Sequence, residues 1–159
     1  VHLESVQPAA VMNEVLSLVG QNLRADGIEI EVHFPEETKV KADFGRLEQV
    51  FLNLIMNSNH AIRKAKSNGQ PGPHYLRVCS EAKSPGRVEI RIEDSGCGIP
   101  PQNLNKLFKP FFTTKDIGEG TGLGLAIVAQ LVREMEGQIS VQSSAGKGTT
   151  FFLELQSEP

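Results

Sequence analysis

Four glycines alternate with other residues in Gly118-Glu119-Gly120-Thr121-Gly122-Leu123-Gly124-Leu125, and an apolar helical pattern follows directly. Glycine permits backbone conformations that other residues rarely adopt, and it lets a ligand approach the main chain closely. The start of a helix presents free N–H groups and a partial positive charge, both of which favour phosphate. The segment therefore predicts a phosphate-binding loop. Its spacing and the other motifs of the chain indicate which type of loop it is.

The spacing of these glycines excludes the common phosphate-binding motifs. A dinucleotide-binding loop needs G-x-G-x-x-G, and Leu123 and Leu125 stand where its third glycine would be. A P-loop needs Ser or Thr after its Gly-Lys pair, whereas Gly146-Lys147 is followed by Gly148. The V-A-I-K and H-R-D motifs of protein kinases do not occur in the sequence.

The composition is that of a globular domain, and it gives no support for a nucleic-acid or membrane partner. Of 159 residues, 39% are hydrophobic and 22% are charged, with a formal net charge of -3. No apolar run approaches the ~20 residues of a bilayer helix.

We expect one domain over residues 1–159, and the absence of an initiator Met before Val1 favours a fragment of a longer protein. Cys79 and Cys97 fit neither a disulfide framework nor a zinc site, which favours reduced thiols in a cytoplasmic domain.

Hydrophobic periodicity predicts three main helices and a largely antiparallel sheet. We expect helices over residues 8–24, 43–66 (with Asp43 as the cap) and 123–136. Strands are expected over 28–34, 75–81 and 87–93, with a last hairpin of 138–143 and 149–155. Residues 39–42 are a candidate for a short partner strand. Segregated helices over an open sheet make the predicted fold class a two-layer α/β sandwich.

Polar side chains share one face of the helix predicted over 43–66. At ~100° per residue, Asn53, Asn57, His60 and Lys64 fall within roughly 60° of each other, and the apolar residues lie mostly on the other side. An amide oxygen can bind a hard cation such as Mg²⁺. The alternative is a solvated polar face, since exposed amides are common.

Two further segments are candidates for a nucleotide site. The segment Asp94-Ser95-Gly96-Cys97-Gly98-Ile99-Pro100 follows a predicted strand. Its acid could accept a hydrogen bond from an exocyclic amine while the glycines let a flat base approach; the alternative is a tight turn. Phe108, Phe111 and Phe112 lie between the two glycine segments, where they either hold the base of a lid or fill the core.

Taken together, these residues resemble the catalytic ATP-binding domain of sensor histidine kinases, in the wider group that includes DNA gyrase and the chaperone and mismatch-repair ATPases. Asn53-Leu54-Ile55-Met56-Asn57 resembles the N box. Residues 94–98, 120–125 and 146–149 resemble the three glycine boxes, and 108–112 the F box. The resemblance covers nearly the whole chain and implies a mixed five-stranded sheet with three main helices on one face, with ATP between helices and a mobile lid.

The resemblance implies a site for the cofactors ATP and Mg²⁺. Asp94 would bind the adenine amino group, within a segment that includes Gly96, Gly98 and Ile99, and Thr149 would support the adenine end. Asn57 would bind the Mg²⁺ that bridges the phosphates, with Asn53 beside it.

The same resemblance places a lid over the phosphates. Its hinge and the phosphate-facing helix start would comprise Gly120, Thr121, Gly122, Leu123, Gly124 and Leu125, with Phe108 at the base of the lid. Further candidates for phosphate contacts are His60, Lys106 and Lys115. We expect residues 113–122 to be the most mobile part of the nucleotide-free chain.

Phosphoryl transfer rather than hydrolysis is the activity that the resemblance implies. Gyrase-like and chaperone ATPases have a Glu as the water-activating base at the position of Asn53, and Asn cannot usefully accept a proton. The γ-phosphate would pass to a histidine on a separate dimerisation domain, which this chain lacks, and onward to a response regulator.

We therefore expect the isolated domain to be a monomer that binds ATP without phosphorylating itself, and the full kinase to be a homodimer. The alternatives are a self-sufficient ATPase of the gyrase or chaperone type, and a module that docks partners without nucleotide. Whether the full-length protein is anchored in a membrane stays open.

Overall fold

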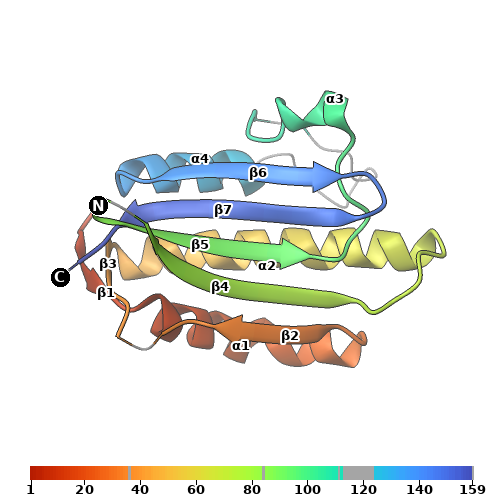
Figure 1. Cartoon of the computed structure of the whole chain (residues 1–159), viewed down its shortest axis with the longest axis horizontal. Coiled ribbons are helices and arrows are strands. Elements are labelled where there is room, and N and C mark those ends of the chain that lie inside the picture. The colour runs from red at the N-terminus through yellow and green to blue at the C-terminus, as the bar shows by residue number, and fades with distance from the viewer. Residues whose placement is uncertain (36, 84, 111, 113–123, 159) are drawn as a thin grey trace.

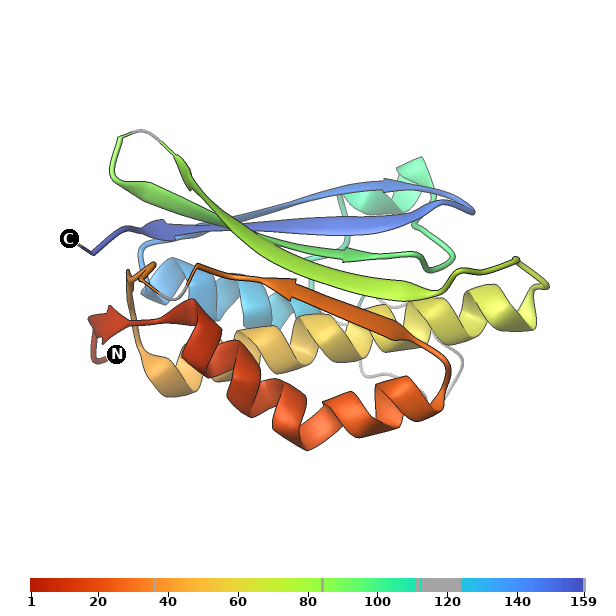
Figure 2. The ribbon, with the colours of Figure 1, turned by 60° about the horizontal axis from the view of Figure 1, so that its bottom comes forward.

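Helices cover one face of a five-stranded sheet formed by the described residues, and the opposite face of that sheet is open (Figure 1, Figure 2). The computed structural model describes residues 1–35, 37–83, 85–110, 112 and 124–158. The elements, in chain order, are β1 (Glu4–Val6), α1 (Pro8–Ala25), β2 (Glu29–His33), β3 (Val40–Ala42), α2 (Phe44–Ser67), β4 (Tyr75–Lys83), β5 (Arg87–Asp94), α3 (Pro101–Leu104), α4 (Gly124–Glu134), β6 (Gln138–Ser144) and β7 (Gly148–Gln156). The two-layer α/β sandwich predicted from the sequence is confirmed.

The sheet is mixed because one pair of neighbouring strands is parallel. The strand order is β2-β4-β5-β7-β6, and β2 runs parallel to β4 while the other neighbours are antiparallel. Along β5, Val88, Ile90, Ile92 and Asp94 are buried, and the residues between them are half-buried. Since successive side chains of a strand point to opposite faces, this alternation puts the Asp94 carboxylate on the same face as the apolar core.

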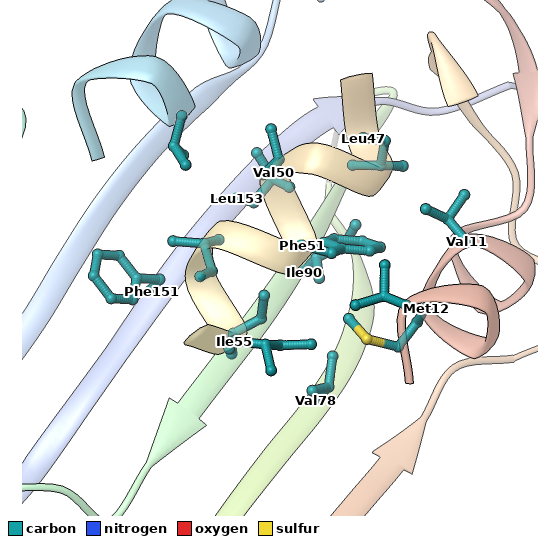
Figure 3. Close-up of a cluster of buried hydrophobic side chains, with 14 of the residues drawn as sticks. Val11, Met12, Leu47, Val50, Phe51, Ile55, Val78, Ile90, Phe151 and Leu153 are labelled. Carbon is teal, nitrogen blue, oxygen red and sulfur yellow. The ribbon is translucent and has the colours of Figure 1, made fainter. Parts of the chain in front are cut away.

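Helix α2 supplies the centre of the core. Asp43 caps it as predicted, because Asp43 Oδ1 accepts a hydrogen bond of 3.1 Å from Arg46 N–H. The apolar residues expected opposite the polar face are buried, namely Leu47, Phe51, Leu54, Ile55 and Ile62, and Val50 is buried with them. Figure 3 shows Phe51 in one cluster with Met12 of α1 and Ile90 of β5. The helix therefore has one face fixed by the sheet and by α1.

The short strand expected at 39–42 forms, but it does not join the main sheet. Strand β3 pairs antiparallel with β1, which the sequence analysis did not predict, in a separate two-stranded sheet. Strand β2 instead pairs with β4. Strands of three residues have too few alternating positions to reveal a partner from sequence.

The two ends of the chain lie at one end of the molecule, and the glycine-rich turns lie at the other (Figure 1). At that second end, the last turns of α2, the end of β5 and the turn between β6 and β7 come together. Within the part of the chain that the structure describes, no helix is both long and apolar enough to cross a membrane.

Replacement of the central aromatic ring tests this packing. Phe51→Ala should lower the free energy of unfolding by about 3–5 kcal/mol, because it leaves a cavity under α2. Denaturant unfolding measures the change. Leu18→Ala is the matched control, since Leu18 of α1 is 66% exposed, and it should change stability by no more than about 0.5 kcal/mol. Equal effects of the two substitutions would contradict the assignment of the core.

Candidate functional site

A row of inward-facing residues crosses four strands at the glycine-rich end of the sheet. The register pairs Leu76 with Asp94, Asp94 with Thr149, and Thr149 with Ser143. Asp94 is 1% exposed and Thr149 is 4% exposed. A hollow of about 190 Å³ at this end is lined in part by Asp94, Ser143, Thr149 and Lys147. The inner face of the sheet, apolar along most of its length, thus ends in a carboxylate and two hydroxyls.

The Asp94 carboxylate is buried with one oxygen free to accept a hydrogen bond. Asp94 Oδ1 accepts a hydrogen bond of 2.8 Å from Gly96 N–H. Burial raises the pKa of Asp94 to about 6, although the Gly96 amide, the Ser58 hydroxyl and the Thr149 amide act to lower it. Among the described residues, neither Asp94 Oδ2 nor Ser58 Oγ has a partner at hydrogen-bond geometry. Buried polar atoms normally have partners, and Asp94 Oδ2 keeps the capacity to accept a hydrogen bond.

The turn after β5 approaches α2 so closely that residue 96 has no room for a side chain. A Cβ on Gly96 would lie 2.6 Å from Ala61 Cβ and 2.7 Å from the carbonyl carbon of Ala61. Cys97 N–H donates a hydrogen bond of 3.0 Å to the Ala61 carbonyl oxygen. On the other side, Gly98 has a φ of 74°, and a Cβ there would overlap the Ser144 carbonyl oxygen. The glycine turn is therefore held between α2 and the β6–β7 hairpin.

Two side chains that the sequence analysis did not single out hold the start of this turn. Tyr75 N–H donates to Ser95 Oγ at 2.8 Å, which ties the turn to the first residue of β4. Gln70 Nε2 donates to the Ser95 carbonyl oxygen at 3.0 Å. Both partners come from segments distant in sequence, so no local motif could have predicted them.

Ser143 of β6 holds the end of the same turn and was also missed. Its Oγ accepts a hydrogen bond of 2.8 Å from Ile99 N–H and lies 2.8 Å from Thr149 Oγ1. The sequence did contain a signal for it, because Ser143 is a polar residue at an inward position of a predicted hairpin, directly opposite Thr149.

The predicted polar face of α2 is only partly buried. Asn53, Asn57 and His60 are each half-buried. Asn53 Nδ2 donates to the carbonyl oxygen of Gly124, the first residue of α4, at 3.4 Å. Glu48, on an earlier turn of α2, interacts with Glu14 of α1: burial and the Glu14 charge raise the pKa of Glu48. The carboxylate nearest in sequence to Asn53 on this helix is thus engaged with α1.

The remaining predicted residues fall into three groups. Phe108 packs edge-to-face on Phe151, with ring centroids 6.4 Å apart, and Leu125 packs against the core. Lys106 is exposed after α3, and its side chain has no hydrogen bond or ion pair with another described residue. Lys115, Gly120, Thr121, Gly122 and Leu123 lie outside the described residues, as does the segment 113–122 that was expected to be mobile.

Comparisons of the sequence match the chain to one family and to whole sensor proteins. Residues 42–159 match the family described as histidine kinase-, DNA gyrase B-, and HSP90-like ATPase. The chain is 39% identical to the two-component sensor PprA of Pseudomonas aeruginosa over 93% of its length, and 39% identical to the sensor histidine kinase ZraS of Escherichia coli over 95%. It spans only 16% and 30% of the lengths of these two relatives.

Solved structures give the same match in three dimensions. The mycobacterial sensor histidine kinase MprB superposes with a TM-score of 0.82 at 30% identity, covering 99% of both chains. Full-length ShkA, solved in complex with AMPPNP, superposes with a TM-score of 0.82 at 28% identity, covering 99% of this chain and 31% of that one.

The burial of Asp94 predicts a characteristic pH dependence of stability. A raised pKa means that the folded chain holds this proton more tightly than the unfolded chain, so the contribution of Asp94 to stability falls as pH rises from 3.8 to about 6. Asp94→Asn removes this fall and should make the chain more stable at pH 7 by up to about 3 kcal/mol, since each pKa unit corresponds to about 1.4 kcal/mol.

Denaturant unfolding of both chains between pH 4 and pH 8 measures the effect. The stability of Asp94→Asn relative to the parent chain should increase over this range and level off above pH 7. A difference that does not vary with pH would show that the Asp94 carboxylate has an ordinary pKa.

Proposed function

This chain belongs to the family of histidine kinase-, DNA gyrase B- and HSP90-like ATPases, as the catalytic domain of a sensor histidine kinase, and we propose that it binds Mg-ATP and donates the γ-phosphate to a histidine of a separate domain. The observation that carries the proposal is the buried Asp94 carboxylate, whose Oδ2 has no hydrogen-bond partner among the described residues, beside a turn that has no room for a side chain at Gly96 or Gly98. ShkA, a structural neighbour, was solved with the ATP analogue AMPPNP, which supports a nucleotide as the ligand.

The adenine ring would lie against the glycine turn. Gly96 lets the turn pack closely against Ala61 of α2, and Gly98 lets it pack against Ser144 of the hairpin. The hydrogen bonds from Cys97 N–H to Ala61 and from Ile99 N–H to Ser143 fix the turn against which the base would lie. An exocyclic amine can donate to Asp94 Oδ2, and this bond would supply the partner that the buried oxygen lacks. A hydrogen bond to a charged group is worth about 1.5–3 kcal/mol, so this contact would contribute strongly to affinity.

The described residues fit Mg²⁺ bound together with phosphates. None of them form a cluster of three or more His, Cys, Asp or Glu that could hold a metal ion alone. Mg²⁺ in nucleotide sites keeps several waters and takes one or two protein oxygens besides the phosphates, so the amide of Asn57 with Asn53 beside it is a sufficient protein contribution. Bound Mg²⁺ would supply neutralisation of the phosphate charge.

The side chains favour transfer of the phosphoryl group over hydrolysis. Asn53 is an amide and cannot take a proton from water, and Glu48 interacts with Glu14 rather than with the polar face of α2. Catalysis would then consist of orienting the γ-phosphate toward an incoming histidine, with positioning as its main source. The acceptor would be the dimerisation domain of the same kinase, which would pass the phosphoryl group to a response regulator in two-component signal transduction.

The setting of the domain is part of the same proposal. Residues 1–159 would form a single ATP-binding domain on the cytoplasmic side of a longer homodimeric sensor protein. The full length of the relatives supports this, because the chain spans less than a third of either sensor described above.

Nucleotide titration tests the proposed function. Calorimetric titration with ATP and Mg²⁺ should show one binding site. Asp94→Asn should weaken binding by about a hundredfold, because the charged acceptor is replaced by an amide. Asn57→Ala should weaken it by about tenfold in Mg²⁺, with little change when Mg²⁺ is absent. The matched control is Asn13→Ala, which removes an exposed amide from α1 and should have no effect.

Other results would favour the alternatives. A flat titration of the unmodified chain would indicate a module that docks partners without nucleotide. Steady ATP turnover by this chain alone would favour a self-sufficient ATPase. Wild-type affinity in Asp94→Asn would contradict the placement of adenine.

A further inference from the structure

Ser143 Oγ has three hydrogen-bond contacts, and together they determine which of its neighbours donate and which accept. It accepts from Ile99 N–H at 2.8 Å, lies 2.9 Å from the Gly148 carbonyl oxygen, and lies 2.8 Å from Thr149 Oγ1. A carbonyl oxygen can only accept, so the Ser143 proton must point to Gly148.

The direction of the third contact follows from counting protons. Ser143 has one proton, and Gly148 uses it, so the contact with Thr149 is a hydrogen bond only if Thr149 is the donor. Ser143 Oγ then accepts two bonds, from Ile99 and from Thr149, and its capacity is filled. Thr149 Oγ1 is left with no proton to donate elsewhere and with lone pairs that can accept.

We propose that Ser143 determines base specificity by holding the Thr149 hydroxyl as a pure acceptor beside Asp94, so that the site selects a 6-aminopurine over a 6-oxopurine. The inference rests on the proposed binding of ATP at this site. Asp94 and Thr149 are opposite each other on β5 and β7, and both are buried on the inner face of the sheet. Ser143 acts through Thr149 and is a positioning residue.

The hydrogen-bonding groups of the two bases explain why the 6-aminopurine would bind more tightly. A 6-amino group offers two donor hydrogens to the acceptors Asp94 Oδ2 and Thr149 Oγ1, either directly or through one water. A 6-oxo group offers only lone pairs, so neither acceptor would receive a hydrogen bond from the substituent at this position. Sites built for a hydrogen-bonding group discriminate strongly against analogues that lack it, because their own polar groups stay unpaired.

Removal of the Ser143 hydroxyl should release the Thr149 proton. In Ser143→Ala, Thr149 can rotate its O–H into the site and donate to a 6-oxo group. The ratio of the dissociation constants for inosine triphosphate and ATP should therefore fall by about tenfold, roughly the value of one hydrogen bond. Calorimetric titration of each nucleotide with Mg²⁺ gives this ratio. Ser143→Thr keeps a hydroxyl and should retain the wild-type ratio, and Ser144→Ala on the same strand is the control.

The ratio of the two dissociation constants distinguishes a role of Ser143 in base specificity from simple support of the glycine turn, which the affinity for one nucleotide would not do. If Ser143 only held Ile99 in place, Ser143→Ala would weaken both nucleotides equally and leave the ratio unchanged, which would overturn the inference. Thr149→Val should lower the ratio by itself, and adding Ser143→Ala to it should lower the ratio no further. A further fall in the double variant would also overturn it. Failure of the unmodified chain to bind either nucleotide would instead contradict the proposed function.

Discussion

The close approach of α2 to the turn after β5 is the contact on which the candidate site depends. It is possible because Gly96 has no side chain and because the facing residue, Ala61, has a small one. The hydrogen bond from Cys97 N–H to the Ala61 carbonyl oxygen fixes the distance. As a result, the residues proposed to bind the base and those proposed to bind the metal belong to elements locked to one another. Any shift of α2 would move both sets together.

The candidate site includes a group whose burial lowers the stability of the free chain, the Asp94 carboxylate. Its carboxylate lies at the end of a sheet face that is apolar along most of its length, and burial disfavours its charged form. The fold offsets part of that cost with the Gly96 amide but leaves Asp94 Oδ2 without a partner among the described residues. Sites of this kind exchange stability for function. An unpaired buried acceptor lowers the stability of the free chain, and for the same reason a ligand that donates a hydrogen bond to it would bind more tightly.

The sequence predicted those parts of the molecule whose signals are local. The three long helices, the β6–β7 hairpin and the Asp94 turn each have a periodic pattern or a glycine spacing, and their positions agree with the structure. The β1–β3 pair could not be predicted, since strands of three residues contain almost no pattern. Gln70 and Ser95 were missed because their partners are set by tertiary contacts. Lys106 was selected only by the resemblance, which does not determine the contacts of its side chain.

Titration of the Asp94 carboxyl carbon by NMR, with and without Mg-ATP, tests the central claim most directly. In the free chain the pKa of Asp94 should be about 6. Mg-ATP should lower that pKa, because a donor on the base stabilises the charged carboxylate. A bound nucleotide that leaves the Asp94 titration unchanged would show that the base lies elsewhere, and it would contradict the account of this site.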